Sequence, residues 1–129
     1  MIVVDASVLV TALVDDGHDG TKARTALTDD ALLAPDIIDL EMLSVLRRMS
    51  HAGSLDPARA SEAVEDLRHF PLTRVSHVAL TTRCWELREN LTPYDAVYVA
   101  LAEVMGATLL TGDRRLAAAP GIRCTAALL

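Results

Sequence analysis

Four carboxylates stand out because each lies beside an apolar segment, at or near the end of a predicted element: Asp5, Glu41, Asp95 and Asp113. Asp5, for example, directly follows the apolar residues 2–4. A carboxylate between buried segments is costly to desolvate unless a partner neutralises it. Four such acids in one site would raise one another's pKa values, and a divalent cation removes that conflict. Oxygen ligands without His or Cys favour Mg²⁺ or Mn²⁺ over zinc.

Each acid also has an ordinary structural explanation. Asp5 could cap the helix that follows it, and Asp113 could cap a short helix that begins with RRLAAA. Asp95 falls at the third helical position of a capping box that starts at Thr92. Glu41 lies at the edge of the apolar stripe of its helix, where a surface carboxylate is common. These alternatives stay open for each acid alone, and the occurrence of all four together favours a shared site.

The elements that must position these acids alternate between short β-like runs and longer helical patterns, which is typical of a parallel α/β sheet. We expect strands at 2–5, 32–34, 72–76, 107–111 and 122–125, and helices at 6–14, 19–29, 36–52, 57–69, 77–90 and 93–105. Asp36 is expected to cap helix 36–52. Ligands of open α/β sheets bind beyond the carboxyl ends of strands, which is where Asp5 and Asp113 fall.

Composition narrows the class of protein. A length of 129 residues predicts one domain over 1–129. No apolar run approaches the roughly 20 residues of a membrane span, and no secretory signal begins the sequence, so we expect a soluble cytoplasmic protein. The net charge of −6 argues against a protein that coats nucleic acid, but it is compatible with a nuclease whose acids hold a metal. Cys84 and Cys124 fit no disulfide framework or zinc motif.

The sequence resembles a PIN domain and, more narrowly, the VapC-type toxins of bacterial type II toxin–antitoxin pairs. The resemblance rests on four motifs in family order and at family-like spacing: DAS after the first strand, the helical Glu in LEMLSVLRR, the helix TPYDAVYVALA and the terminal LLTGD. The least similar stretch is DDGHDGTKAR. The resemblance implies a three-layer α/β/α sandwich with a mostly parallel central sheet.

The resemblance also implies a function, a metal-dependent endoribonuclease that leaves 5′-phosphate and 3′-hydroxyl ends. It assigns the catalytic, metal-binding quartet to Asp5, Glu41, Asp95 and Asp113, and the supporting hydroxyls to Ser7 and Thr111. The implied cofactor is one or two Mg²⁺ or Mn²⁺ ions. The implied partners are an RNA substrate, a cognate VapB-like antitoxin and a second copy of the chain, with no membrane. A catalytically silent PIN-like binding module is the alternative, although such modules usually lose part of the quartet.

Substrate contacts are less determined by the sequence. Four arginines lie close in sequence to Glu41 or Asp113 and are candidates for phosphate contacts: Arg47, Arg48, Arg114 and Arg115. For each of them, a surface arginine paired with a nearby acid is the simpler explanation. Aromatic residues are 3% of the chain, which argues against base stacking as the main mode of recognition. We therefore expect a folded RNA that is read largely by its shape.

Overall fold

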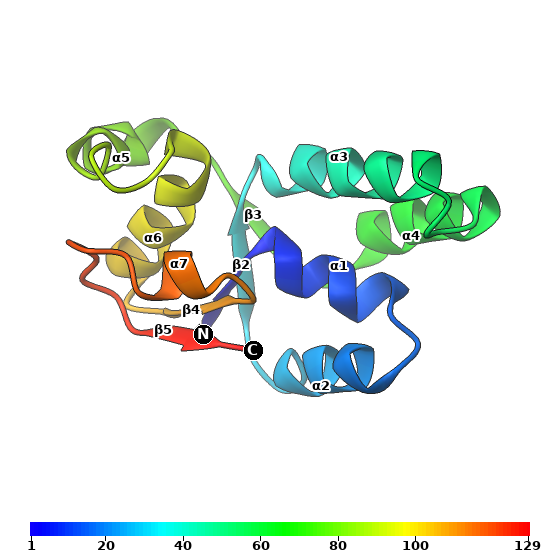
Figure 1. Cartoon of the computed structure of the whole chain (residues 1–129). Helices are drawn as coiled ribbons and strands as arrows, with labels where there is room; N and C mark the ends of the chain where they lie inside the picture. Colours follow the sequence, from blue (N-terminus) through cyan, green and yellow to red (C-terminus); the bar gives the residue numbers. More distant parts are fainter.

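The computed structural model describes residues 1–129 and contains a five-stranded sheet between two groups of helices (Figure 1). The elements are β1 (Ile2–Val4), α1 (Ala6–Val14), α2 (His18–Ala26), β2 (Leu32–Pro35), α3 (Ile38–His51), α4 (Pro57–His69), β3 (Thr73–Val75), the 3₁₀ turn η1 (Val78–Leu80), α5 (Thr81–Glu86), α6 (Pro93–Met105), β4 (Thr108–Thr111), α7 (Arg114–Ala117) and β5 (Ala126–Leu128). None of the helices is long and apolar enough to cross a membrane.

The strand order is β3-β2-β1-β4-β5, and every neighbouring pair is parallel. In Figure 1, α5 and α6 lie on one side of β1 and β2, while α1, α3 and α4 lie on the other. Strands covered on both faces read as short continuous apolar runs rather than alternating ones, as the sequences IVV and TLLT do. The expected three-layer α/β/α sandwich with a parallel sheet is confirmed.

The core lies on both sides of the sheet and contains 31 buried residues. On one side α6 buries seven consecutive residues, Ala96 to Ala102, because the sheet covers one of its faces and α5 another. A helix that is apolar all round is a buried helix. On the other side, Val8 and Leu9 of α1 are fully or almost fully buried. α6 contacts both β1 and β4, and α1 contacts β4, so the two helices cover the strands that end beside Asp5 and Asp113.

Three predicted details are wrong. The last strand is β5, Ala126–Leu128, and not 122–125, because the Arg123 amide donates to the Glu103 carboxylate (2.7 Å) and ties that segment to α6. The predicted helix 77–90 is divided into η1 and α5, and α5 ends at Glu86, after which the Leu87 amide donates to the Arg83 and Cys84 carbonyls (3.2 Å each). Asp36 does not cap α3, because its own amide continues the sheet ladder to the Val75 carbonyl.

Candidate active site

Asp5 lies directly after β1, and only 9% of its surface is exposed. Its Oδ2 atom accepts hydrogen bonds from the Ser7 hydroxyl (2.8 Å) and the Thr111 hydroxyl (2.7 Å). Asp5 occupies the N-cap position of α1, but its side chain caps no backbone amide. The explanation of Asp5 as a side-chain helix cap is therefore wrong, and its carboxylate is held instead by two hydroxyl groups.

Ser7 and Thr111 are oriented by the turn that follows β4. The Ser7 hydroxyl oxygen accepts a bond from the Gly112 amide (3.0 Å), and the Thr111 hydroxyl oxygen accepts one from the Asp113 amide (3.0 Å). Because the amides take up acceptor positions, each hydroxyl proton is directed at Asp5. Gly112 suits this turn, since a Cβ there would lie 3.3 Å from the Ser7 oxygen. The two hydroxyls thus connect the ends of β1 and β4.

Asp95 and Asp113 share one arginine. Nη2 of Arg115 donates to Oδ2 of Asp95 (2.8 Å) and to Oδ2 of Asp113 (3.4 Å). Asp113 also caps α7, as Oδ1 accepts bonds from the Arg115 and Leu116 amides, so the capping role expected for it is confirmed. In α6 the cap is Thr92, whose hydroxyl accepts from the Asp95 amide (3.3 Å). The carboxylate of Asp95 is left free to face Arg115.

Glu41 lies in the first turn of α3 and is half-buried. Its Oε1 atom accepts a hydrogen bond of 2.7 Å from the hydroxyl of Tyr98, which is fully buried on α6. A freely solvated surface carboxylate is therefore the wrong description of Glu41. Sequence reasoning missed Tyr98, although a tyrosine within the buried apolar stretch of the helix, about one turn after Asp95, was a signal that could have found it.

The electrostatics join these acids into one site. Burial raises the pKa of Asp5 above its ordinary value, the hydroxyls of Thr111 and Ser7 oppose that rise, and the charge of Asp95 adds to it. Burial likewise raises the pKa of Glu41, the Tyr98 hydroxyl lowers it, and the charges of Asp5 and Asp95 raise it further. Three of the four carboxylates therefore repel one another, and Arg115 connects the fourth to them.

In this structure the acids are not close enough together to form a metal site. No group of three or more His, Cys, Asp or Glu side chains is arranged to hold a metal ion. The cation that the site already contains is the guanidinium of Arg115, whose side chain is 62% exposed. The chemistry of the donor set, four carboxylates with oxygen donors only, of which three repel one another, nonetheless fits a hard divalent cation.

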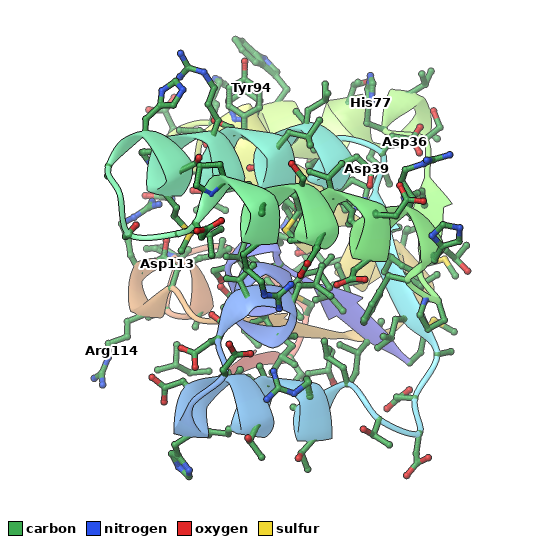
Figure 2. The ribbon with its side chains drawn as sticks, turned by 90° about the vertical axis from the view of Figure 1, so that its right-hand side faces the viewer. Asp36, Asp39, His77, Tyr94, Asp113 and Arg114 are labelled. Atoms are coloured by element: carbon green, nitrogen blue, oxygen red, sulfur yellow. The ribbon has the colours of Figure 1, made fainter.

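The candidate arginines fall in different places. Arg115 enters the acid site, whereas Arg114 points away from the body of the molecule (Figure 2). Arg47 and Arg48 are exposed on α3. The structure therefore brings only Arg115 of the four into contact with the acids, and there it pairs with carboxylates.

Comparison with known proteins agrees with this fold. The chain matches the PIN domain family over residues 2–122. A VapC ribonuclease of Mycobacterium bovis is 40% identical over 124 residues, which cover 96% of this chain and 94% of that protein. Ribonuclease VapC3 of Mycobacterium tuberculosis is 42% identical over 118 residues, which cover 92% of this chain and 86% of the relative.

Solved structures show the same fold at lower identity. The crystal structure of Mycobacterium tuberculosis VapC20, described as a Sarcin-Ricin loop cleaving toxin, has a TM-score of 0.68 at 17% identity and covers 95% of this chain and 99% of that one. The DNA-bound VapBC complex of Salmonella typhimurium has a TM-score of 0.68 at 18% identity, with 97% and 96% covered. With the sequence identities above, these findings show that the chain belongs to the PIN domain family and, within it, to the VapC ribonucleases.

Proposed function

We propose that this chain is the toxin of a type II toxin–antitoxin pair and acts as a divalent-metal-dependent endoribonuclease, with residues 1–129 as one PIN-like unit. The observation that carries the proposal is the buried Asp5 carboxylate, which two hydroxyls orient while Glu41 and Asp95 repel it. A fold that keeps acids in mutual repulsion gains stability when a cation enters. The VapC ribonucleases to which the chain is similar support the activity.

The proposed ligands of one or two Mg²⁺ or Mn²⁺ ions are Asp5, Asp95 and Asp113, with Glu41 binding directly or through water. When bound, such an ion would neutralise the acids, hold a phosphodiester oxygen and lower the pKa of a coordinated water. Binding requires Arg115 to release Asp95 and Asp113. Because the Arg115 side chain is largely exposed, it can turn outward without breaking the core.

The chain's own residues have distinct proposed tasks. Ser7 and Thr111 hold the Asp5 carboxylate in one orientation, and Tyr98 does the same for Glu41. The guanidinium of Arg115, once displaced from the acids, can form a fork with a phosphate oxygen. Attack by water in line with the leaving 3′ oxygen produces 5′-phosphate and 3′-hydroxyl ends. Arg47, Arg48 and Arg114 stay predictions as contacts to the RNA backbone.

The test is cleavage of total cellular RNA by the purified chain with Mn²⁺, with Mg²⁺ and with EDTA. We expect cleavage only with metal, 5′-phosphate at the mapped cut sites, and a loss of at least about 100-fold in Asp5→Asn. Asp16→Asn is the matched control, because Asp16 is exposed and lies outside the site. Cleavage that persists in EDTA, or at the normal rate in Asp5→Asn, would refute the proposal.

Metal binding has its own measurement. Thermal stability should rise and saturate as Mn²⁺ is added, by about 2.7 kcal/mol when the ion is present at 100 times its dissociation constant. Asp95→Asn should abolish most of that rise, whereas Asp16→Asn should keep it. Saturable binding without cleavage of any RNA would favour the catalytically silent PIN-like module instead.

The biological role follows from the same proposal. A cognate VapB-like antitoxin and a second copy of the chain are the proposed protein partners, and the cytoplasm is the proposed location because the RNA substrate is there. Expression of the chain alone should arrest growth, and co-expression of the antitoxin should restore it. Arrest should be absent in Asp5→Asn. Growth that continues normally with the folded, metal-binding wild type would count against a toxin.

A further inference from the structure

Helices α3 and α4 form a hairpin that carries Glu41 in its first turn. The hairpin begins at Ile38 and ends at His69, and both of these ends lie beside the sheet (Figure 1). Ile37 occupies the N-cap position of α3, and its side chain has no oxygen that could accept from the first-turn amides. Because no side-chain cap fixes the turn that contains Glu41, contacts with distant elements must do so.

One arginine on the edge strand β3 joins both ends of this hairpin. Nε and Nη2 of Arg74 donate to the two carboxylate oxygens of Asp39, in the first turn of α3, at 2.8 and 2.7 Å. Nη2 also donates to the Leu67 carbonyl (3.1 Å) in the last turn of α4, and Nη1 donates to the Leu72 carbonyl (3.2 Å) just before β3. Bidentate pairing with a carboxylate fixes both the position and the direction of a guanidinium. Arg74 therefore clamps the base of the hairpin to the sheet.

Asp39 and Glu41 lie on nearly opposite sides of α3, since two helical positions correspond to a rotation of about 200°. On one side Asp39 meets Arg74 of β3, and on the other side Glu41 accepts from the Tyr98 hydroxyl of α6 at 2.7 Å. Between them, Ile38 is fully buried. Because the first turn is held from two sides, a rotation or a shift of α3 breaks at least one of these bonds.

The pair of Asp39 and Arg74 lies outside the acid site. In Figure 2, Asp39 is well separated from Asp113, which lies across the molecule from it. The hydrogen bonds from Arg74 neutralise Asp39, and they raise the pKa of Arg74 above its ordinary value, so the pair stays charged. Any effect of this pair on the acids must therefore pass through the backbone of α3.

We propose that Arg74 is a positioning residue for the metal site, because its clamp on Asp39 sets the direction in which α3 presents Glu41 to Asp5. The inference deepens the proposed ribonuclease function and rests on it. Arg74 itself contacts neither metal nor RNA. Replacement of residues that orient a metal ligand from behind changes metal affinity by about 10- to 100-fold.

A second arginine pair provides a matched comparison. Nε and Nη2 of Arg83 donate to both carboxylate oxygens of Glu103, at 2.7 and 3.1 Å, and Nη2 also donates to the Gly121 carbonyl (2.8 Å). Glu103 lies near the far end of α6, about 12 Å along the helix axis from Asp95. Loss of either arginine removes a bidentate pair and a carbonyl contact, but only Arg74 holds the helix of Glu41.

The first measurement is binding of Mn²⁺ to the full-length protein, followed by the electron paramagnetic resonance signal of free Mn²⁺ under conditions where circular dichroism shows every variant folded. We expect Arg74→Met to raise the Kd for Mn²⁺ by about 10-fold or more, and Arg83→Met to change it by less than about 2-fold. Asp39→Asn keeps Arg74 and its two carbonyl contacts, so it serves if Arg74→Met does not fold. It should raise the Kd by about 3-fold or more.

The second measurement needs no metal and reports on the bond between Tyr98 and Glu41. Tyr98→Phe should lower the urea midpoint of the protein in EDTA, because it removes the donor to Glu41. In the Arg74→Met background that decrease should shrink by at least about half, since α3 no longer holds Glu41 beside Tyr98. In the Arg83→Met background the decrease should keep its full size.

The outcomes separate this inference from the proposed function. An unchanged Kd in Arg74→Met overturns the inference while the nuclease stands, and so does an unchanged effect of Tyr98→Phe in that background. Equal losses of affinity in Arg74→Met and Arg83→Met also overturn it, because they would show a general loosening of the fold. A wild type that binds no Mn²⁺ refutes the proposed metal site, and the effect of Tyr98→Phe then decides whether Arg74 positions Glu41.

Discussion

Replacement of Thr111 by valine tests how the site holds its buried acid. Thr111 is fully buried at the end of β4, and its hydroxyl donates to Asp5 at 2.7 Å and accepts from the Asp113 amide at 3.0 Å. Valine has nearly the same shape, so Thr111→Val removes both hydrogen bonds without leaving a cavity. Asp5 then keeps only one side-chain donor, Ser7.

The expected loss follows from these two bonds. A hydrogen bond to a charged group contributes roughly 1.5–3 kcal/mol, and an amide left without its acceptor adds to that cost. We therefore expect Thr111→Val to lower the free energy of unfolding by about 2–4 kcal/mol at pH 7 without metal. For a domain of this size each kcal/mol corresponds to about 3–5 °C in Tm, so Tm should fall by roughly 6–20 °C.

The assay is urea unfolding in EDTA, followed by circular dichroism. Thr111→Ser keeps the hydroxyl and should lose less stability than Thr111→Val. Thr108→Val is the matched control on the same strand, because Thr108 makes no side-chain hydrogen bond there and should change stability by less than about 0.5 kcal/mol. A double-mutant cycle with Asp5→Asn measures the charged part of the bond, for which we expect a coupling of about 1 kcal/mol.

Two results would refute this reasoning. A loss below about 0.5 kcal/mol in Thr111→Val would mean that the buried hydroxyl does not stabilise the Asp5 carboxylate. An equal loss in the wild-type and Asp5→Asn backgrounds would mean that the cost comes from the Asp113 amide or from packing, and not from the charge of Asp5.

Three further predictions concern stability without metal. Because burial holds the pKa of Asp5 and Glu41 above their ordinary values, these two groups bind more protons in the folded protein than in the unfolded chain, so their contribution to stability should fall as pH rises from about 4 through the raised pKa values. The urea midpoint should therefore fall less steeply with pH in Asp5→Asn than in the wild type. Tyr98→Phe, which removes the donor to Glu41, should cost about 1–3 kcal/mol in urea unfolding, and a midpoint equal to that of the wild type would show that the bond contributes nothing. Gly20→Ala should cost about 2 kcal/mol or more, because the new Cβ would lie 1.7 Å from the Asp15 carbonyl oxygen; an unchanged Tm would contradict that packing.

The sequence predicted most of the fold because the signals involved are local. Short apolar runs such as 2–4 identify the buried strands, and Thr92 before Pro93 identifies the start of α6, since a cap needs only its own turn. Gly106 ends the same helix with φ of 61°, a conformation that favours glycine. The last strand was misplaced because a contact with distant Glu103 decides where it begins.

By itself the sequence determined the parallel α/β pattern and identified four acids as candidate ligands of a divalent metal ion. Only the tertiary structure decided their partners: Thr111 meets Asp5 across 106 positions of the chain, and Tyr98 meets Glu41 across 57. It also decided that the two exposed aromatic rings, Trp85 and Tyr94, line one hollow, which their positions in the sequence do not show. The reason is physical, because crossovers of a parallel sheet bring distant residues to one edge, and a pattern read along the chain contains no record of those distances.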